Sequence, residues 1–366
     1  MKRCKKCYMP DTRPGSMFDE KGICQACKNY ENRSRIDWDL RKKELDDLCN
    51  KYRRNDGYYD CIVPVSGGKD SHRIVYEIKV LRNMNPLLIT VSDPFTKTRA
   101  GLKNFRNLGE TFNCDHIVFN LSVDLFKRVT KIGFEKLGEP LKFIEAAIYT
   151  VPFKMGIRLG IPLVFFGENS AYEYGSTDKE SMPANEAIMK LFDTIDLNFW
   201  LENGISVKEI NALIPPSDEE LKKVDPLVVY LSYFIPWSST INRQIAIRYG
   251  FSDLAHEWIR EGYIENFEQI DSEAYLIHLW LKYPKFGFQR VCDIASRRVR
   301  EGLLSLSEAK NIIKTNDHII DQKALEDFCN TLGYTKKQFW DIVERFWNPD
   351  IFEKKDGIWQ LKERYL

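Results

Sequence analysis

The fold of this chain is decided by the stretch Tyr59-Asp60-Cys61-Ile62-Val63-Pro64-Val65-Ser66-Gly67-Gly68-Lys69-Asp70-Ser71. Its first half is a short apolar run, which predicts a buried β-strand that ends near Pro64, because proline has no N–H to donate to a neighbouring strand. From Ser71 to Leu81 the apolar residues recur at helical spacing. The stretch therefore predicts a strand, a glycine turn and a helix, in that order.

The turn predicts a phosphate-binding loop made of Ser66, Gly67, Gly68, Lys69, Asp70 and Ser71. Its two glycines let the backbone turn sharply and approach an anion, and the helix that follows directs free N–H groups at that anion. The serines and the lysine add hydroxyl donors and a positive charge. The spacing matches neither a Walker A loop nor a G-x-G-x-x-G turn. The alternative is an ordinary glycine turn in which Asp70 caps the helix.

Strand and helix patterns alternate on both sides of this loop. Further strands are expected at 87–91, 116–121 and 162–166, and helices at 36–52, 100–108, 123–137 and 143–158. This alternation is typical of an α/β protein with a doubly wound, mostly parallel sheet. Beyond about Asp193 the β signal fades and helical patterns dominate. We therefore expect three parts: a metal-binding module at 1–32, the sheet domain at 33–192 and a mainly helical region at 193–366.

The composition sets the broad class of protein. The 366 residues are 43% hydrophobic and 29% charged, which is enough for a full core and excludes intrinsic disorder. A net charge of +1 argues against a protein that binds nucleic acid through a strongly basic surface. The longest uncharged stretch, Pro226 to Asn242, is too short for a membrane span and is interpreted as buried core. With no secretory signal at the start, the expected location is the cytoplasm.

Four of the nine cysteines form two C-x-x-C pairs near the N-terminus: Cys4, Cys7, Cys24 and Cys27. This spacing predicts a closed four-thiolate site, which usually holds a structural zinc ion. An iron–sulfur cluster is the main metal alternative, and redox-active cysteines are the other interpretation. Because four protein ligands leave no open coordination position, the expected role is structural and not catalytic.

The segment Ser66 to Ser71 resembles the PP-loop of the N-type ATP pyrophosphatases, which split ATP into AMP and pyrophosphate. Together with the four-cysteine module and the helical ending, the segments Gly167 to Gly175 and Leu281 to Asp293 resemble the N-acetyl sugar amidotransferases. That resemblance covers essentially the whole chain. It departs at Gln289, where a second glycine is expected.

The resemblance implies an enzyme that converts an N-acetyl group of a bacterial surface sugar into an acetamidino group, with ATP, Mg²⁺ and ammonia. The expected catalytic residues are Lys69, Asp70, Glu168 and Glu173. ATP binding is assigned to Ser66, Gly67, Gly68, Lys69, Asp70, Ser71 and Asp93, and substrate binding to Asn169, Tyr172, Lys285, Arg290 and Asp293. For the carboxylates, a turn or a helix cap is the competing interpretation. Arg297 and Arg300 either join the site or form surface ion pairs.

The source of the ammonia follows from what the sequence lacks. The five histidines are dispersed, Cys4 belongs to the metal module and Cys61 lies in a strand, so no glutaminase nucleophile is recognisable. The resemblance implies a separate glutaminase with a barrel partner, similar to the two subunits of imidazole glycerol phosphate synthase. A tRNA thiolase with the same loop is the alternative enzyme, although Cys114 and Cys292 stand alone. A non-catalytic nucleotide-sensing adaptor is the alternative outside enzymes.

Overall fold

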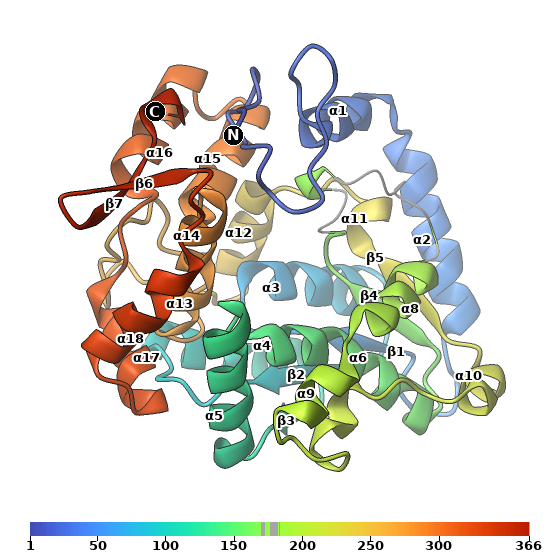
Figure 1. Ribbon diagram of the computed structural model, residues 1–366. Helices are drawn as coiled ribbons and strands as arrows, with labels where there is room; N and C mark the ends of the chain where they lie inside the picture. The colour runs from blue at the N-terminus through green and yellow to red at the C-terminus, as the bar shows by residue number, and fades with distance from the viewer. Residues whose placement is uncertain (170–172, 176–181, 183, 366) are drawn as a thin grey trace.

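A five-stranded sheet forms the centre of the molecule in the computed structural model, which describes residues 1–169, 173–175, 182 and 184–365 (Figure 1). All neighbouring strands are parallel, in the order β3-β2-β1-β4-β5. The strands are β1 (Cys61–Pro64), β2 (Pro86–Ser92), β3 (His116–Asn120), β4 (Leu163–Phe166) and β5 (Leu227–Tyr230). The doubly wound parallel sheet expected from the sequence is therefore confirmed.

The strand order places a switch point between β1 and β4. β1 pairs on one side with β2, in the register Cys61↔Pro86, and on the other with β4 at Ile62↔Val164. β1 ends at Pro64 as expected, and the N–H of Val65 still donates to Ile89 at 2.9 Å. At such a point the connections leave in opposite directions, so a crevice opens outside the carboxyl ends of the strands.

Helices cover both faces of the sheet. On one face, Cys61 and Val63 of β1 pack in a cluster with residues of α2, α3, α4 and α11, and on the other face Ile62 packs with residues of α6 and α8. These helices and their neighbours are α2 (Trp38–Tyr52), α3 (Lys69–Val75) continued by the π-helix η2 (Tyr76–Leu81), α4 (Arg99–Phe112), α5 (Val123–Ile132) continued by the π-helix η3 (Gly133–Leu137), α6 (Lys142–Leu159), α8 (Asn185–Thr194), α9 (Leu197–Glu202), η4 (Glu209–Leu213), α10 (Asp218–Val224), α11 (Leu231–Phe234) and α12 (Ser239–Arg248).

The four predicted strands and the helices between them are confirmed, but the sheet does not end before residue 193. Its fifth strand, β5, lies inside the uncharged run that was interpreted only as buried core. β5 has four residues and is covered on both faces, so it carries no alternating pattern that would separate it from a core helix. A second short sheet, the antiparallel hairpin of β6 (Phe352–Lys355) and β7 (Ile358–Leu361), also lies in the region expected to be helical.

The C-terminal helices pack against the sheet domain and share a core with it. Phe126 and Phe134 of the α5 region and Ile144 of α6 belong to the same apolar cluster as Phe328 and Phe339. These helices are α13 (Tyr275–Trp280), α14 (Lys282–Phe286), α15 (Arg290–Arg300), α16 (Leu306–Asn316), α17 (Gln322–Leu332) and α18 (Lys336–Val343), followed by η5 (Glu344–Phe346), the hairpin and η6 (Glu363–Tyr365). Figure 1 shows them gathered along one side of the sheet domain.

The N-terminal module contains α1 (Gln25–Asn32) and η1 (Arg33–Arg35) and leads into α2. It contacts the C-terminal helices: Thr12 donates to the carbonyl of Phe286 at 2.5 Å, and Arg13 pairs with Asp293 of α15. Among the described residues, the chain has no helix that is both long and apolar enough to span a membrane.

Candidate active site

The loop between β1 and α3 has the backbone geometry that its glycines predict. Gly67 has φ +97°, and a Cβ at this position would lie 3.1 Å from the backbone of Phe105 on α4. The backbone of Gly68 is extended, and there a Cβ would meet only the hydroxyl of Ser66, at 3.4 Å. The N–H of Ser66 donates to the Ser71 hydroxyl at 2.9 Å, which closes the loop on itself. Only Gly67 therefore requires glycine for its conformation.

His72 supports the loop from behind. Its Nδ1 lies 3.0 Å from the carbonyl oxygen of Gly68, and its Nε2 lies 3.1 Å from the side-chain amide of Asn107. These partners fit a neutral imidazole that donates from Nδ1 and accepts at Nε2. Burial lowers the pKa of His72 to about 4. The sequence predicted only a structural role for this histidine, without its contact to the loop.

Lys69 is buried and held between two carboxylates. Its Nζ lies 2.7 Å from Asp70 Oδ2 and 3.1 Å from Glu268 Oε1. Burial disfavours the ammonium, but the charges of Asp70 and Glu268 outweigh it and raise the pKa of Lys69 above its ordinary value. The other oxygen of Asp70 accepts a hydrogen bond of 2.7 Å from Asn242 of α12. The carboxylate of Asp70 is therefore bound between Lys69 and α12.

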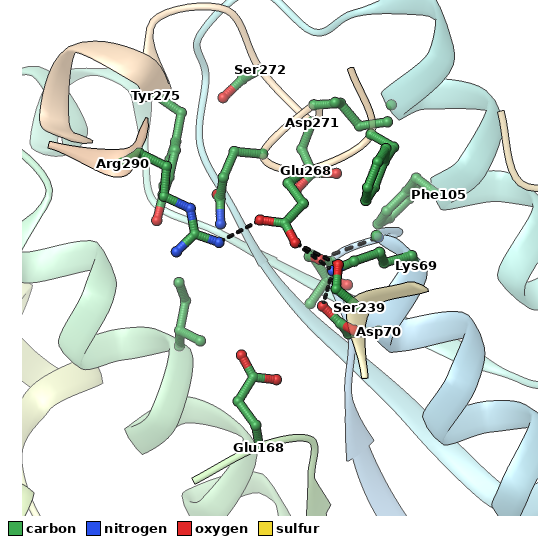
Figure 2. A pocket seen from close by; sticks show the side chains of 18 of the residues that line it. Lys69, Asp70, Phe105, Glu168, Ser239, Glu268, Asp271, Ser272, Tyr275 and Arg290 are labelled. Carbon is green, nitrogen blue, oxygen red and sulfur yellow. Dashed lines mark hydrogen bonds and ion pairs between the residues drawn. The ribbon is translucent and has the colours of Figure 1, made fainter. Parts of the chain in front are cut away.

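Glu268 forms the centre of a cluster that the sequence did not reveal (Figure 2). Besides Lys69, it binds Arg290 at 2.6 Å, Arg297 at 2.6 Å and the Ser239 hydroxyl at 2.8 Å. Burial opposes its charge, yet the surrounding cations hold its pKa well below the ordinary value. Glu268 lies in the segment 249–274, which has no regular helix or strand, so no periodic pattern could place it. The cluster connects the loop to the C-terminal helices.

A cavity of about 580 Å³ opens beside this cluster, at the carboxyl ends of β1, β2 and β4. Its polar wall combines loop and C-terminal residues: Ser66, Gly68, Lys69, Asp70, Glu268, Arg290, Arg297 and Arg300. Its apolar wall is formed by Leu102, Phe105, Val118, Leu141, Ile144, Ile148 and Phe267. The cavity thus combines cationic side chains that suit anionic groups with apolar side chains that suit a flat ring.

Glu168 follows β4 and lines the cavity, as the sequence predicted. Figure 2 shows it across the cavity from Glu268, with its carboxyl group directed into the space between them. Burial and the nearby charge of Asp70 raise the pKa of Glu168 to about 7. Glu173 also lines the cavity but is bound by Arg33 of the N-terminal module. The two glutamates therefore differ: Glu168 faces the cavity, whereas Glu173 lines the cavity and forms an ion pair with the N-terminal module.

Asp93 lies beyond the end of β2 in the same cavity, where the sequence placed it. It accepts from Lys97 Nζ at 2.8 Å and from the backbone N–H of Phe95 at 3.0 Å. Asp271, a neighbour that the sequence did not suggest, also lines the cavity, and burial and then Asp93 raise its pKa to about 7. Among the described residues, its buried Oδ1 has no hydrogen-bond partner.

Three residues assigned to substrate binding lie off the cavity. Lys285 pairs with Glu139 at 3.2 Å, and Asp293 pairs with Arg13. Asn169 is buried, and its carbonyl accepts the N–H of Glu173 at 3.0 Å. Nearness in sequence to Glu168 or Arg290 does not decide which side chain faces the cavity, and the role of these three residues in substrate binding stays a prediction. Tyr172 lies outside the described residues.

The four cysteines of the module come together as predicted. Their Sγ atoms all lie within 4.8 Å of one another, with Cys4–Cys27 at 3.9 Å and Cys7–Cys24 at 3.5 Å. Thiolates at about 2.3 Å from one tetrahedral ion are separated by about 3.8 Å, so the donor set fits a single ion. The backbone N–H groups of Lys6 and Cys24 point at Cys4 Sγ, at 3.4 and 3.3 Å.

The module also forms part of the site. Arg300 lines the cavity and donates to Cys7 Sγ at 3.6 Å, and Arg13 lies 3.9 Å over the ring of Tyr174. Tyr174 in turn accepts from Arg290 at 2.7 Å. The expected structural role therefore extends to positioning the arginines of the site.

A second cavity, of about 960 Å³, lies between the module, the start of α12 and the end of α15. It shares three lining residues with the first cavity: Trp237, Arg300 and Glu301. Its other walls include Tyr30, Trp38 and the metal-site residues Cys7 and Cys27. The two cavities therefore adjoin each other at this point.

The fold and the loop define a doubly wound α/β protein with a phosphate-binding loop after β1, completed by a C-terminal helical region. Residues 261–365 match the family described as "LPS biosynthesis protein WbpG-like, C-terminal domain". These residues, less than a third of the chain, are therefore similar to a WbpG-like C-terminal domain, in agreement with the resemblance seen in the sequence. The domain supplies Glu268, Arg290 and Arg297 to the site.

Other likenesses are more distant. "Uncharacterized protein MJ1599" of Methanocaldococcus jannaschii is 24% identical over 158 residues, 43% of this chain and 56% of that protein, so the chain spans little more than half of this relative. An NH3-dependent NAD synthetase from Campylobacter jejuni shares 14% identity over 59% of this chain and 96% of its own, with a TM-score of 0.30. The U34-tRNA thiolase NcsA from Methanococcus maripaludis shares 16% identity over 68% of this chain and 80% of its own, with a TM-score of 0.25. These structural likenesses carry no argument about function.

Proposed function

We propose that this protein is an ATP-dependent, AMP-forming amidotransferase that converts an N-acetyl group of a bacterial surface-glycan sugar into an acetamidino group. One observation carries the proposal: the phosphate-binding loop and the WbpG-like domain meet in one cavity, where Lys69 and two arginines of that domain bind the same carboxylate. A domain named for lipopolysaccharide biosynthesis thus contributes side chains directly to a site suited to phosphates.

The reaction needs activation of a poor electrophile. The amide oxygen attacks the α-phosphorus of ATP and pyrophosphate leaves; ammonia then adds to the imidate carbon, loses a proton, and AMP departs with the oxygen. Lys69, with the loop N–H groups and the arginines, would stabilise the charge that develops on the pyrophosphate. Asp70 and Glu168 offer the carboxylate oxygens that Mg²⁺ prefers. When bound there, Mg²⁺ would neutralise phosphate charge.

The rest of the cavity suits the nucleoside and the sugar. Phe105, Phe267 and Val118 provide an apolar surface for the adenine ring, beside Asp93 and Asp271, whose oxygens can bind ribose or amino groups. The acetamido group is then expected near Glu168, which also lines the cavity. We place the reaction in the cytoplasm, where ATP is available.

We further propose that ammonia comes from a separate glutaminase with a barrel partner, as the sequence resemblance implies. The second cavity is the proposed entry for ammonia, because it shares Trp237, Arg300 and Glu301 with the first cavity but, among the described residues, none of the phosphate-binding loop. No cysteine lines the first cavity among the described residues, which disfavours both a glutaminase function of this chain and the tRNA thiolase alternative.

The test is to incubate the purified protein with ATP, Mg²⁺, ammonium salt and a panel of nucleotide-linked N-acetyl sugars, with mass spectrometry of the products. Replacement of a carbonyl oxygen by NH lowers the mass of the sugar by about one unit. Sugar-dependent release of AMP and pyrophosphate with this shift supports the proposal. AMP release only with tRNA and a sulfur donor would favour the thiolase instead.

A further inference from the structure

The carboxylate of Glu268 is bound on both oxygens by groups that also bind phosphate. Oε1 lies 3.1 Å from Lys69 Nζ, 2.6 Å from Arg297 Nη2 and 2.8 Å from the Ser239 hydroxyl, and Oε2 lies 2.6 Å from Arg290 Nη2. A lysine, a hydroxyl and two guanidinium groups around one anion form the donor set of a phosphate site. The loop lysine and Arg297 share a single oxygen atom, so both would reach one oxygen of a phosphate placed there.

A carboxylate leaves this donor set partly unused. Among the described residues, Nε of Arg290 and Nε of Arg297 are buried without a hydrogen-bond partner. Each guanidinium therefore binds Glu268 through one arm and leaves a second donor unpaired, which is costly in a buried site. A pyrophosphate group has more oxygens and more negative charge than a carboxylate, so it can satisfy more of these donors.

Glu268 can leave its partners without a change in the fold. Its backbone is anchored separately, because Arg260 donates to the carbonyl oxygens of Glu268 at 2.7 Å and Gln269 at 3.3 Å. Gln269 has φ +52°, an uncommon conformation for a side-chain-bearing residue, and such conformations cluster at functional sites. Since Glu268 itself lines the cavity, rotation of its side chain is enough to free Lys69 and the two arginines.

We propose that Arg290 and Arg297 are ligands of the departing pyrophosphate of ATP, and that the Glu268 carboxylate occupies their phosphate site until ATP displaces it. This inference rests on the proposed function and deepens it. It makes Glu268 an internal competitor of ATP. It also assigns Arg297, which the sequence left between the site and the surface, to nucleotide binding.

The experiment is calorimetric titration of the full chain with pyrophosphate and with ATP, each with and without Mg²⁺. Glu268→Gln keeps the shape but removes the competing charge, so pyrophosphate should bind about tenfold more tightly than to the unmodified protein. Arg297→Lys keeps the charge but loses the forked donor and should weaken pyrophosphate binding several-fold. The matched control is Glu273→Gln, because Glu273 is a buried glutamate of the same segment that pairs with Lys323 at 2.5 Å and does not line the cavity. This control should leave the affinity within about twofold.

Unchanged or weaker pyrophosphate binding by Glu268→Gln would overturn the inference, and so would an Arg297→Lys variant that binds as tightly as the unmodified protein. A loss of affinity in Glu268→Gln confined to the Mg²⁺-containing titrations would identify Glu268 as a metal ligand and also overturn it. In these cases ATP still binds and the proposed function stands. If the unmodified protein binds neither ATP nor pyrophosphate, the proposed function fails together with the inference.

Discussion

Lys69 of the phosphate-binding loop and Glu268 of the C-terminal domain form a buried ion pair, with 3.1 Å between Nζ and Oε1. This contact joins the end of β1 to a segment without helix or strand that runs between α12 and α13. It closes the site around the lysine, because the same glutamate also binds α15 through Arg290 and Arg297. The loop and the WbpG-like domain therefore act as one unit, and changes on either side should affect the other.

Lys69→Ala should abolish AMP formation. Lys69 is the only cation among the loop residues Ser66 to Ser71, and removal of such a donor costs about a hundredfold or more in rate. The measurement is release of AMP and pyrophosphate, with metal content and circular dichroism as controls for folding. Lys103→Ala, on the exposed side of α4, is the matched control and should keep full activity. Turnover by Lys69→Ala at the normal rate would contradict the loop assignment.

The two loop glycines should respond differently to alanine. Gly67→Ala meets both a positive φ and a backbone contact at 3.1 Å, so it should lower the free energy of unfolding by about 1–3 kcal/mol. Gly68→Ala meets only the Ser66 hydroxyl at 3.4 Å, so its effect should stay below about 1 kcal/mol. Urea denaturation of the two variants and the unmodified protein measures these free energies of unfolding. Equal losses of stability would show that the loop does not depend on the φ of Gly67.

The sequence was most informative where residue type and order carry the physical signal. The run from Tyr59 to Ser71 identified β1, the loop and α3 because glycines, a proline and helical spacing act locally. The four-cysteine site could also be predicted, because each C-x-x-C pair is a local sequence pattern. Glu268 and Asp271 were missed, and Arg297 was left undecided, because only the packing of the segment 249–274 and α15 brings them to the cavity. Lys285 and Asp293 lie off the cavity for a similar reason: spacing along a helix does not tell which partner binds each side chain.

His72 should make stability depend on pH. Its pKa in the folded protein is about 4, against an ordinary value of 6.5, so the unfolded chain binds a proton first as the pH falls. The stability that comes from this group is complete above about pH 6.5 and is lost toward pH 4, by roughly 3 kcal/mol. Urea denaturation at pH 7.5 and 4.5 should show a larger drop for the unmodified protein than for His72→Gln. His256→Gln, at an exposed histidine, should behave like the unmodified protein.

Loss of the metal site should affect the cavity as well as the module. Cys24→Ser should lower the metal content from about one ion per chain, lower the melting temperature, and weaken binding of the sugar, because Cys7 accepts from Arg300 of the cavity. Elemental analysis also distinguishes zinc from iron. Cys114→Ser, at a cysteine outside the cluster, should keep the metal. An unchanged metal content in Cys24→Ser would contradict the four-thiolate site.

Glu168 should link nucleotide binding to pH. Because its pKa is about 7, the carboxylate is mostly protonated at pH 6 and mostly ionised at pH 8. If it holds Mg²⁺, the affinity for ATP in the presence of Mg²⁺ should rise over this range by more in the unmodified protein than in Glu168→Gln, where only the titration of ATP itself remains. Calorimetric titration at both pH values measures the difference. Without Mg²⁺, ionised Glu168 repels the phosphates, so the affinity of the unmodified protein should fall over this range relative to that of Glu168→Gln.

The raised pKa of Glu168 also predicts that a rise in pH lowers the stability of the ligand-free protein, whereas it strengthens Mg²⁺-dependent ATP binding. A carboxyl group whose pKa rises on folding takes up a proton, so its contribution to stability is complete below its ordinary pKa of 4.5 and is lost as the pH rises through about 7. At pH 8 the neutral Glu168→Gln should therefore melt at a higher temperature than the unmodified protein, while at pH 5 the two should melt alike. A variant that is both more stable at pH 8 and weaker in Mg²⁺-dependent ATP binding would mark Glu168 as a charge kept for function at the expense of stability. A Glu168→Gln protein with no gain in stability at pH 8 would show that the carboxyl group is not buried as the structure has it.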